Sequence, residues 1–288
     1  RYCEACAVGE RSGMNYNCIK SYVTAEERAY IVNNSESQVV ITSSGKLAAV
    51  VEAMPTFDDV SLILVVGGVP AGSDERIRDY ATAINDQPTT VLDNELLGTS
   101  MLYSSGTTGQ PKGIMRPLPG QAPTQNLPIF DFLSNLWQYR DGMIYLSPAP
   151  LYHSAPQAAV NLTIRQGGTA IIMERFDPLE YLRLIEKYGV THSQLVPTMF
   201  SRMLKLPIAE REAPDLSSLE FAVHAAAPCP VQVKEQMIDW WGPIIHEYYG
   251  ATEGLGFSAC NSEEWLAHKG TVGKIVLGEV FVADDDMN

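Results

Sequence analysis

The sequence predicts an α/β fold made of largely parallel sheets flanked by helices. One observation behind this prediction is that apolar runs of strand length alternate with segments of helical period along most of the 288 residues. The other is that two helical segments carry starting signals. Thr24 to Glu27 has the form of a capping box, and Asp177-Pro178 joins a capping carboxylate to a proline at the first helical position.

The expected strands and helices have the following positions along the chain. Buried strands are predicted at 38–42 (QVVIT) and 61–66 (SLILVV), with a helix near 45–54 between them and a polar helix at 73–85 after them. Further strands are predicted at 101–105, 143–147, 169–173, 191–196, 220–225 and 244–249. Further helices are predicted at 24–34, 127–139, 154–166, 177–188 and 230–241, and one begins at Pro197. The stretches 117–126 and 206–218 are predicted to be loops, and neither is long enough for a domain linker.

Composition restricts the partners and the compartment. The formal net charge of −14 argues against a nucleic-acid partner, because a polyanion would be repelled over most of the surface. No apolar run reaches the roughly 18 residues of a membrane span, and RYCEACAVGE has no signal-peptide pattern. Five scattered cysteines fit a reducing cytoplasm. Cys3 and Cys6 are expected to be small residues buried one helical turn apart, since no second pair follows at metal-ligand spacing. The expected location is cytoplasmic; peripheral membrane attachment and the oligomeric state are left open.

A loop rich in glycine and hydroxyl side chains follows the strand at 101–105. In YSSGTTGQPKG (103–113), small residues leave successive backbone N–H groups accessible, and Lys112 brings a positive charge. This chemistry suits phosphate. The stretch differs from the Walker form, because Pro111 precedes Lys112 and Gly113 follows it. The candidate phosphate-binding residues are Ser104, Ser105, Gly106, Thr107, Thr108, Gly109 and Lys112.

SSGTTGQPKG resembles the phosphate-loop signature of the adenylate-forming enzymes, the AMP-binding superfamily of acyl-CoA synthetases, luciferases and peptide-synthetase adenylation domains. Three further stretches are similar to motifs of that family in the same order: PLYH (150–153), HAAAPCP (224–230) and YGATE (249–253). The wider sequence around these motifs most resembles that of bacterial fatty-acyl-CoA synthetases. The resemblance implies the large N-terminal domain of the adenylate-forming fold.

The resemblance also implies a role for each motif. Lys112, His153, Thr252 and Glu253 are expected to be catalytic, with Thr252 on the α-phosphate and Glu253 holding Mg²⁺, a cation that prefers oxygen ligands. The nucleotide is expected to contact Ala226, Ala227, Pro228, Tyr248, Tyr249, Gly250, Ala251 and Thr252 besides the phosphate loop. The acid substrate is expected to contact Tyr152, His153, Thr198, Met199 and Gly250.

The positions of the motifs give an argument that does not depend on the resemblance. Each of the four stretches comes just after a predicted strand. The carboxyl ends of parallel strands share one edge of a sheet, and ligands bind in the crevice there. All four motifs are therefore expected to converge at one edge.

The implied reaction forms an acyl-adenylate from ATP and a carboxylic acid, then a thioester with coenzyme A. The implied cofactors and substrates are thus ATP, Mg²⁺ and coenzyme A. The resemblance covers the chain but only the middle of the family: a partial N-terminal domain, incomplete at both ends, with subdomains at about 1–100 and 101–270 and the start of a β-rich portion at 271–288. The family's ribose-binding aspartate, its hinge and its small C-terminal domain with the catalytic lysine are expected beyond Asn288 and so absent from this chain. The chain alone is therefore expected to have little activity.

The sequence excludes two other classes of enzyme and leaves three alternatives. A serine hydrolase is excluded because GFSAC (256–260) lacks the second glycine of a nucleophile elbow and only His268 follows it. A zinc hydrolase is excluded because His246-Glu247 has Gly250 where a second histidine is needed. Three alternatives stay open: a ligase that passes acyl-AMP to a carrier protein, an enzyme for aryl or other acids, and a nucleotide-binding fragment without catalysis.

Overall fold

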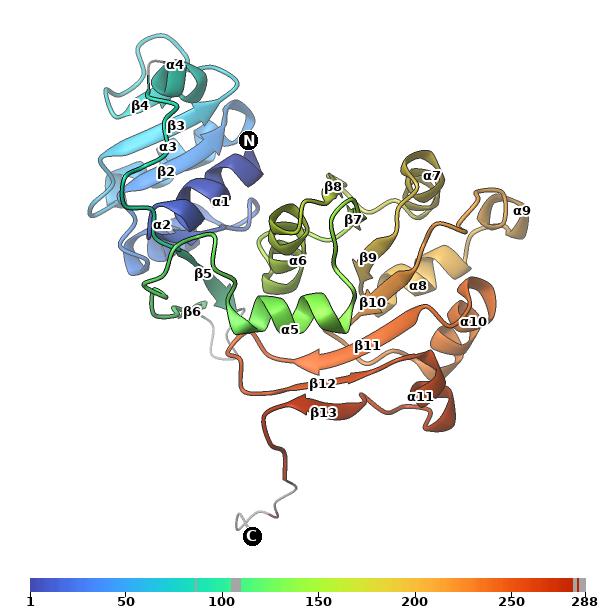
Figure 1. Cartoon of the computed structure of the whole chain (residues 1–288). Coiled ribbons are helices and arrows are strands. Elements are labelled where there is room, and N and C mark those ends of the chain that lie inside the picture. The colour runs from blue at the N-terminus through green and yellow to red at the C-terminus, as the bar shows by residue number, and fades with distance from the viewer. Residues whose placement is uncertain (86, 105–109, 282–283, 285–288) are drawn as a thin grey trace. The chain divides into compact units, whose positions relative to one another are not determined.

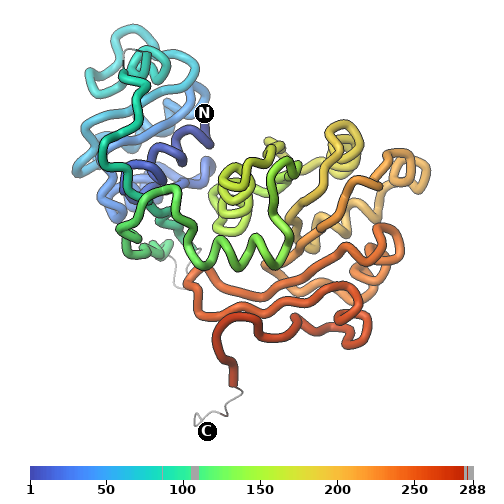
Figure 2. The backbone as a smooth tube through the Cα atoms, viewed as in Figure 1, coloured from blue at the N-terminus to red at the C-terminus, as the bar shows by residue number. Residues whose placement is uncertain are grey.

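The computed structural model describes residues 1–85, 87–104, 110–281 and 284. Five of the predicted phosphate-loop residues, Ser105 to Gly109, lie outside the described residues. The backbone contacts divide the chain into two compact units, residues 1–126 (unit 1) and 127–288 (unit 2). The subdomain division expected near residue 100 stays a prediction. Figure 2 traces the course of the backbone, and the units are described separately.

Unit 1 contains two three-stranded sheets. One has the parallel order β2 (Val39–Ser43), β3 (Leu62–Val66), β4 (Ile77–Asp79), and the other has the order β1 (Asn15–Asn17), β5 (Thr99–Ser104), β6 (Lys112–Ile114). Its helices are α1 (Tyr2–Arg11), α2 (Ala25–Asn34), α3 (Leu47–Ala53) and α4 (Tyr80–Asn85), with short 3₁₀ turns η1 (Ser44–Lys46) and η2 (Met54–Thr56). A cluster of buried aliphatic side chains from α2, α3, β3 and β4 forms its core.

The helix start at Thr24 is confirmed. The Thr24 hydroxyl accepts from the backbone N–H of Glu27 at 3.1 Å, and the Glu27 carboxylate accepts from the N–H of Thr24 at 2.9 Å. Cys6 is buried in α1 and Cys3 is half-buried, close to the expected packing. The Sγ of Cys6 lies 3.9 Å from that of Cys18.

Two expectations about unit 1 are wrong. The polar helix predicted at 73–85 begins only at Tyr80, because Ile77 to Asp79 pairs in parallel with β3 and Ile77 is buried there. Strand pairing thus overrides a weak helical preference. The strand QVVIT is present, but Val39 and Ile41 are 47% and 41% exposed. Among the described strands, β2 pairs only with β3 and so lies at the edge of its sheet.

Unit 2 is built on one seven-stranded sheet. Its orange and red strands lie side by side in Figure 1. The strand order is β13-β12-β11-β10-β9-β7-β8. The five strands from β8 to β11 are parallel, and β12 and β13 are antiparallel to their neighbours, so the prediction of largely parallel sheets is confirmed. The strands are β7 (Ile144–Ser147), β8 (Thr169–Ile172), β9 (His192–Leu195), β10 (Phe221–His224), β11 (Ile245–Gly250), β12 (Phe257–Cys260) and β13 (Lys274–Leu277).

The helices of unit 2 are α5 (Pro128–Leu136), α6 (Ser154–Arg165), α7 (Pro178–Tyr188), α8 (Pro197–Leu204), α9 (Ile208–Arg211), α10 (Val231–Trp241) and α11 (Ser262–Ala267). Most lie close to the predicted positions, but two do not. The stretch 206–218, predicted to be a loop, contains α9, a single turn too short to show helical periodicity, and α11 is absent from the predictions. Asp177 caps α7 by accepting from the N–H of Glu180 at 2.9 Å. Side chains of α7, α8, α10 and α11 pack on the sheet and form the main core. None of the described helices is long and apolar enough to cross a membrane.

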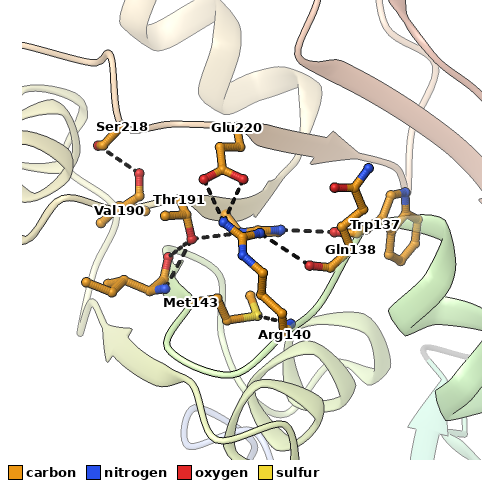
Figure 3. Close-up of polar contacts among 10 residues, drawn as sticks. Trp137, Gln138, Arg140, Met143, Val190, Thr191, Ser218 and Glu220 are labelled. Carbon is orange, nitrogen blue, oxygen red and sulfur yellow. Dashed lines mark hydrogen bonds and ion pairs between the residues drawn. The ribbon is translucent and has the colours of Figure 1, made fainter.

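A polar network joins the amino-terminal ends of three central strands (Figure 3). Arg140, in the turn between α5 and β7, donates to both carboxylate oxygens of Glu220 at 2.7 and 2.8 Å. Thr191, just before β9, donates to the carbonyl of Ile144 at 3.1 Å. Ser218 donates to the carbonyl of Val190 at 2.9 Å. The network holds the turn after α5 against the sheet, at the edge opposite to the motifs.

Candidate functional site at the carboxyl edge of the sheet

Three of the four motifs meet at one edge of the unit 2 sheet. PLYH follows β7, HAAAPCP begins in β10 and continues past its end, and YGATE begins at the end of β11. The parallel neighbours β7, β9, β10 and β11 stand side by side, with Tyr145 opposite His192 and Val223 opposite His246. The expected convergence is therefore present for these three motifs.

The phosphate loop is the exception, and the expectation of one shared sheet edge is wrong for it. Its strand β5 pairs in parallel with β1 and antiparallel with β6, in a sheet of unit 1. Sequence periodicity identifies a strand but does not say which partner supplies its hydrogen bonds. Short strands of similar composition are therefore assigned to the wrong sheet easily.

The two ends of the phosphate loop are neighbours across a β-hairpin. Ser104 on β5 is directly opposite Lys112 on β6, and Lys112 is exposed. Glycine at position 113 leaves room for neighbouring side chains: a Cβ there would lie 2.5 Å from Cε of Met101, the flexible end of that side chain, and 3.1 Å from Cζ of Tyr103. The Tyr103 hydroxyl lies 2.7 Å from the side-chain oxygen of Asn34, which anchors the hairpin to α2. The hairpin thus presents a lysine at the mouth of the loop.

The adenine segment predicted after β10 is open to solvent. Ala226, Ala227 and Pro228 are all exposed, whereas His224, the last residue of β10, is completely buried. Ala226 has φ of +73°, in the left-handed region that disfavours every residue except glycine. Outliers of this kind gather at functional sites, where the surrounding structure enforces them.

The segment after β11 is also open. Tyr249 is 69% exposed, Gly250, Ala251 and Glu253 are exposed, and Thr252 is half-buried. Within the described part of the chain, no hydrogen bond or ion pair engages the Glu253 carboxylate, and no three Asp, Glu, His or Cys side chains gather to form a metal site. A single accessible carboxylate fits Mg²⁺ that takes its other ligands from phosphates and water.

The residues expected at the acid substrate differ in their surroundings. The rings of Tyr152 and His153 are 4.4 Å apart, in the turn where α6 begins. Thr198 is exposed in the first turn of α8, next to the same sheet edge. Met199 is 8% exposed and packs in the hydrophobic core, so its expected contact with the acid stays a prediction.

Two groups of side chains near this edge escaped sequence reasoning. One is a buried polar trio on the face covered by α10: Lys234, Glu247 and His224. The other is an aromatic cluster on the opposite face, in which Tyr248 contacts Phe257 and Trp137. The signal for both was the alternation His246-Glu247-Tyr248, since successive side chains of a strand point to opposite faces. The nucleotide contact expected of Tyr248 stays a prediction. Because its ring packs in this cluster, the backbone of Tyr248 would make that contact.

Burial sets the protonation state of several of these groups. Burial lowers the pKa of His192 to about 4. The pKa of His224 falls to about 3, first through burial and then through the charge of Lys234. Burial raises the pKa of Tyr248 to about 12. Both histidines and this tyrosine are therefore neutral near pH 7.

Comparisons with known proteins agree with this geometry. The chain is 28% identical over 254 residues to the medium/long-chain-fatty-acid–CoA ligase FadD8 of Mycobacterium tuberculosis, covering 85% of this chain and 43% of that protein. It is 29% identical over 206 residues to 4-coumarate–CoA ligase 5 of Oryza sativa subsp. japonica, covering 69% and 38%. The solved N-terminal domain of FACL13 from Mycobacterium tuberculosis superposes with a TM-score of 0.76 at 22% identity, covering 96% of this chain and 67% of that one.

The fold likeness and the family assignment extend over nearly the whole chain. The chain spans about half the length, or less, of the curated relatives it matches. The AMP-binding enzyme family matches residues 9–288. The chain therefore belongs to the AMP-binding enzyme family, the adenylate-forming enzymes, as part of their N-terminal domain.

Proposed function

We propose that the protein activates a carboxylic acid with ATP and then transfers the acyl group to coenzyme A. The observation that carries this proposal is the meeting of three motif segments at one sheet edge, each with exposed small or polar residues. Curated relatives are acid–CoA ligases, which supports the same reaction class.

The proposed chemistry has two steps. A carboxylate oxygen attacks the α-phosphorus of ATP, and the bond from that phosphorus to the oxygen that bridges the α- and β-phosphates breaks. Pyrophosphate leaves, and acyl-AMP stays on the protein. The sulfur of coenzyme A then attacks the acyl carbon and AMP leaves. Charge develops on phosphate oxygens in the first step, so positioning and charge neutralisation are the main tasks of the protein.

The roles proposed for the individual side chains are those that the family resemblance implies. Tyr249 and the exposed backbone of Ala226 to Pro228 would bind the adenine, since small residues let a flat ring approach closely. Thr252 would donate to the α-phosphate, and the backbone amides of the phosphate loop with Lys112 would bind the β- and γ-phosphates. Glu253 would hold Mg²⁺, which supplies positive charge to the phosphates when bound. His153 would border the carboxylate.

The acid is proposed to be a fatty acid. Two observations support this class: the wider sequence resembles that of bacterial fatty-acyl-CoA synthetases, and there are fatty-acid–CoA ligases among the relatives. Relatives that act on 4-coumarate and 4-hydroxybutyrate show how far acid choice varies among proteins of similar sequence.

Carboxylate-dependent exchange of pyrophosphate into ATP tests the first step. The full-length protein is assayed with acids from acetate to hexadecanoate, beside a Glu253→Gln variant. Glu263→Gln is the matched control, because Glu263 is also an exposed carboxylate, on α11. We expect acid-dependent exchange that falls about 100-fold or more in Glu253→Gln, in line with the loss of a transition-state charge contact, and that is retained in Glu263→Gln.

The outcomes separate the open alternatives. If none of the acids supports exchange, the proposal is overturned in favour of a protein that only binds the nucleotide. Exchange without thioester formation on adding coenzyme A would favour transfer to a carrier protein. Strong turnover by residues 1–288 alone would contradict the expectation that the small C-terminal domain of the family is needed.

A further inference from the structure

Side chains of β11 alternate between the two faces of the unit 2 sheet. Glu247 lies on the face covered by α10, where it pairs with Lys234. Tyr248 lies on the opposite face, where its ring centroid is 4.7 Å from that of Phe257 and 5.3 Å from that of Trp137. Gly250, two residues further along the strand, belongs to the same face as Tyr248, one step nearer to the motif edge.

The space beside Gly250 is occupied by an aromatic ring. A Cβ at Gly250 would lie 3.1 Å from Cδ2 of Phe257, tighter than ordinary side-chain contacts. Tyr248 stacks on Phe257 with only 11° between the ring planes, and Phe132 of α5 meets Phe257 edge-on at 5.7 Å. Layered rings therefore fill this face of the sheet directly below the end of β11.

Tyr248 is held in place from the far side of β10. The side-chain amide nitrogen of Gln194 on β9 donates to the Tyr248 hydroxyl at 2.7 Å. Both side chains are half-buried or more, and breaking this bond would leave two polar groups with little access to water. The ring of Tyr248 therefore cannot turn aside easily to admit a ligand.

Trp137 is fixed as firmly as Tyr248. Its carbonyl oxygen lies 2.9 Å from Nε2 of His192, and because a carbonyl can only accept, Nε2 carries the proton. The turn that follows is clamped by the bidentate pair of Arg140 and Glu220 (Figure 3). The wall formed by Tyr248, Phe257 and Trp137 is thus held by two side chains of β9, Gln194 and His192, and by the turn after α5.

This aromatic wall lies beside the place proposed for the acid. Of the residues proposed to contact the acid, His153 follows β7, Thr198 follows β9 and Gly250 ends β11, all at the same edge. An acyl chain that starts there and passes down the Tyr248 face of the sheet meets Phe257 and then Tyr248. Close-packed interiors admit extra methylene groups only with strain, so a fixed wall limits the length of the chain.

We propose that Tyr248 determines acid specificity: it closes the acid pocket and restricts the substrate to acids with a compact acyl group. Short aliphatic and single-ring aromatic acids belong to this class, and long straight-chain fatty acids are excluded. The inference rests on the proposed acid activation. It narrows the proposed fatty acids to short chains and adds single-ring aromatic acids to them.

The test compares kcat/KM for acids of increasing size in the full-length protein, measured by pyrophosphate release. Acetate, hexanoate, dodecanoate and benzoate are used with the wild type, Tyr248→Ala and Tyr248→Phe. Tyr188→Ala is the matched control, because Tyr188 is 43% exposed at the end of α7. The KM for ATP is measured in parallel, since a general structural defect would change it as well.

We expect the wild type to use hexanoate and benzoate far better than dodecanoate. In Tyr248→Ala the ratio of kcat/KM for dodecanoate to that for hexanoate should rise about 10- to 100-fold, a range typical of changes in an apolar pocket. The KM for ATP should stay within about twofold, a margin well under 1 kcal/mol. Tyr248→Phe and Tyr188→Ala should keep the wild-type order of acids, because the wall is intact in both.

Two results would overturn the inference while leaving the proposed function standing. One is a wild type that prefers dodecanoate to hexanoate, and the other is a Tyr248→Ala variant with an unchanged order of acids. If none of the acids supports pyrophosphate release, the proposed function itself fails. If Tyr248→Ala does not fold, Tyr248→Leu, which keeps an apolar side chain, is judged by the same ratio.

Discussion

Lys234 on α10 and Glu247 on β11 form an ion pair inside unit 2, with 2.5 Å between Nζ and Oε2. Lys234 is completely buried and Glu247 is 6% exposed. The ammonium group also lies 4.8 Å from the ring centroid of Trp265. The pair ties α10 to β11 just before the exposed segment that carries Tyr249 and Glu253.

Breaking this pair should destabilise the protein strongly. Lys234→Met leaves the Glu247 carboxylate buried without its partner, which should lower the free energy of unfolding by about 3–5 kcal/mol. Urea unfolding monitored by tryptophan fluorescence measures the change. Lys269→Met is the matched control, because Lys269 pairs with Glu235 on the surface and should matter by less than about 1 kcal/mol. Equal losses in the two variants would contradict the argument.

Mild acid should destabilise the protein through its buried histidines. The pKa values of His192 and His224 are lowered to about 4 and about 3, mainly by burial, so the folded state keeps both neutral when the unfolded state is already protonated. Above about pH 6.5 both histidines are neutral in the folded and the unfolded state, so they do not lower the free energy of unfolding. As the pH falls from there towards 4, protonation of the unfolded state lowers the free energy of unfolding, with a slope of up to about 1.4 kcal/mol per pH unit for each histidine.

Unfolding free energies measured between about pH 7 and pH 4.5 test this dependence. His224→Phe, which keeps an apolar ring of similar size, should flatten the profile. His268→Gln, at an exposed histidine, should not. A profile with the same slope in wild type and in His224→Phe would mean that His224 does not contribute.

Glycine at position 226 should relieve backbone strain. Ala226 has φ of +73°, so Ala226→Gly should raise the free energy of unfolding by about 1 kcal/mol. Ala227 does not have a positive φ, and Ala227→Gly should have the opposite sign, because glycine only adds freedom to the unfolded chain. Thermal unfolding of the two variants checks the contrast. A loss of stability in both would show that the strain at Ala226 is negligible.

Much of the site could be predicted from short, local patterns. Thr24 and Asp177 start their helices because capping depends on residues only three positions apart. The capping box of Asn261 and Glu264 that begins α11 is equally local, and it marks a helix that is absent from the predictions. The positions of PLYH, HAAAPCP and YGATE after parallel strands were predictable for the same reason.

The sequence alone determined the alternation of strands and helices and the chemistry of the motifs, because both depend on neighbours along the chain. Only the tertiary structure decided which strands share a sheet, since β5 takes its partners in unit 1 and not beside β11. It also decided which long-range partners meet on each face of β11: Lys234 with Glu247, and Gln194 with Tyr248. Contacts between residues far apart in sequence depend on strand pairing and packing, and no local pattern encodes them.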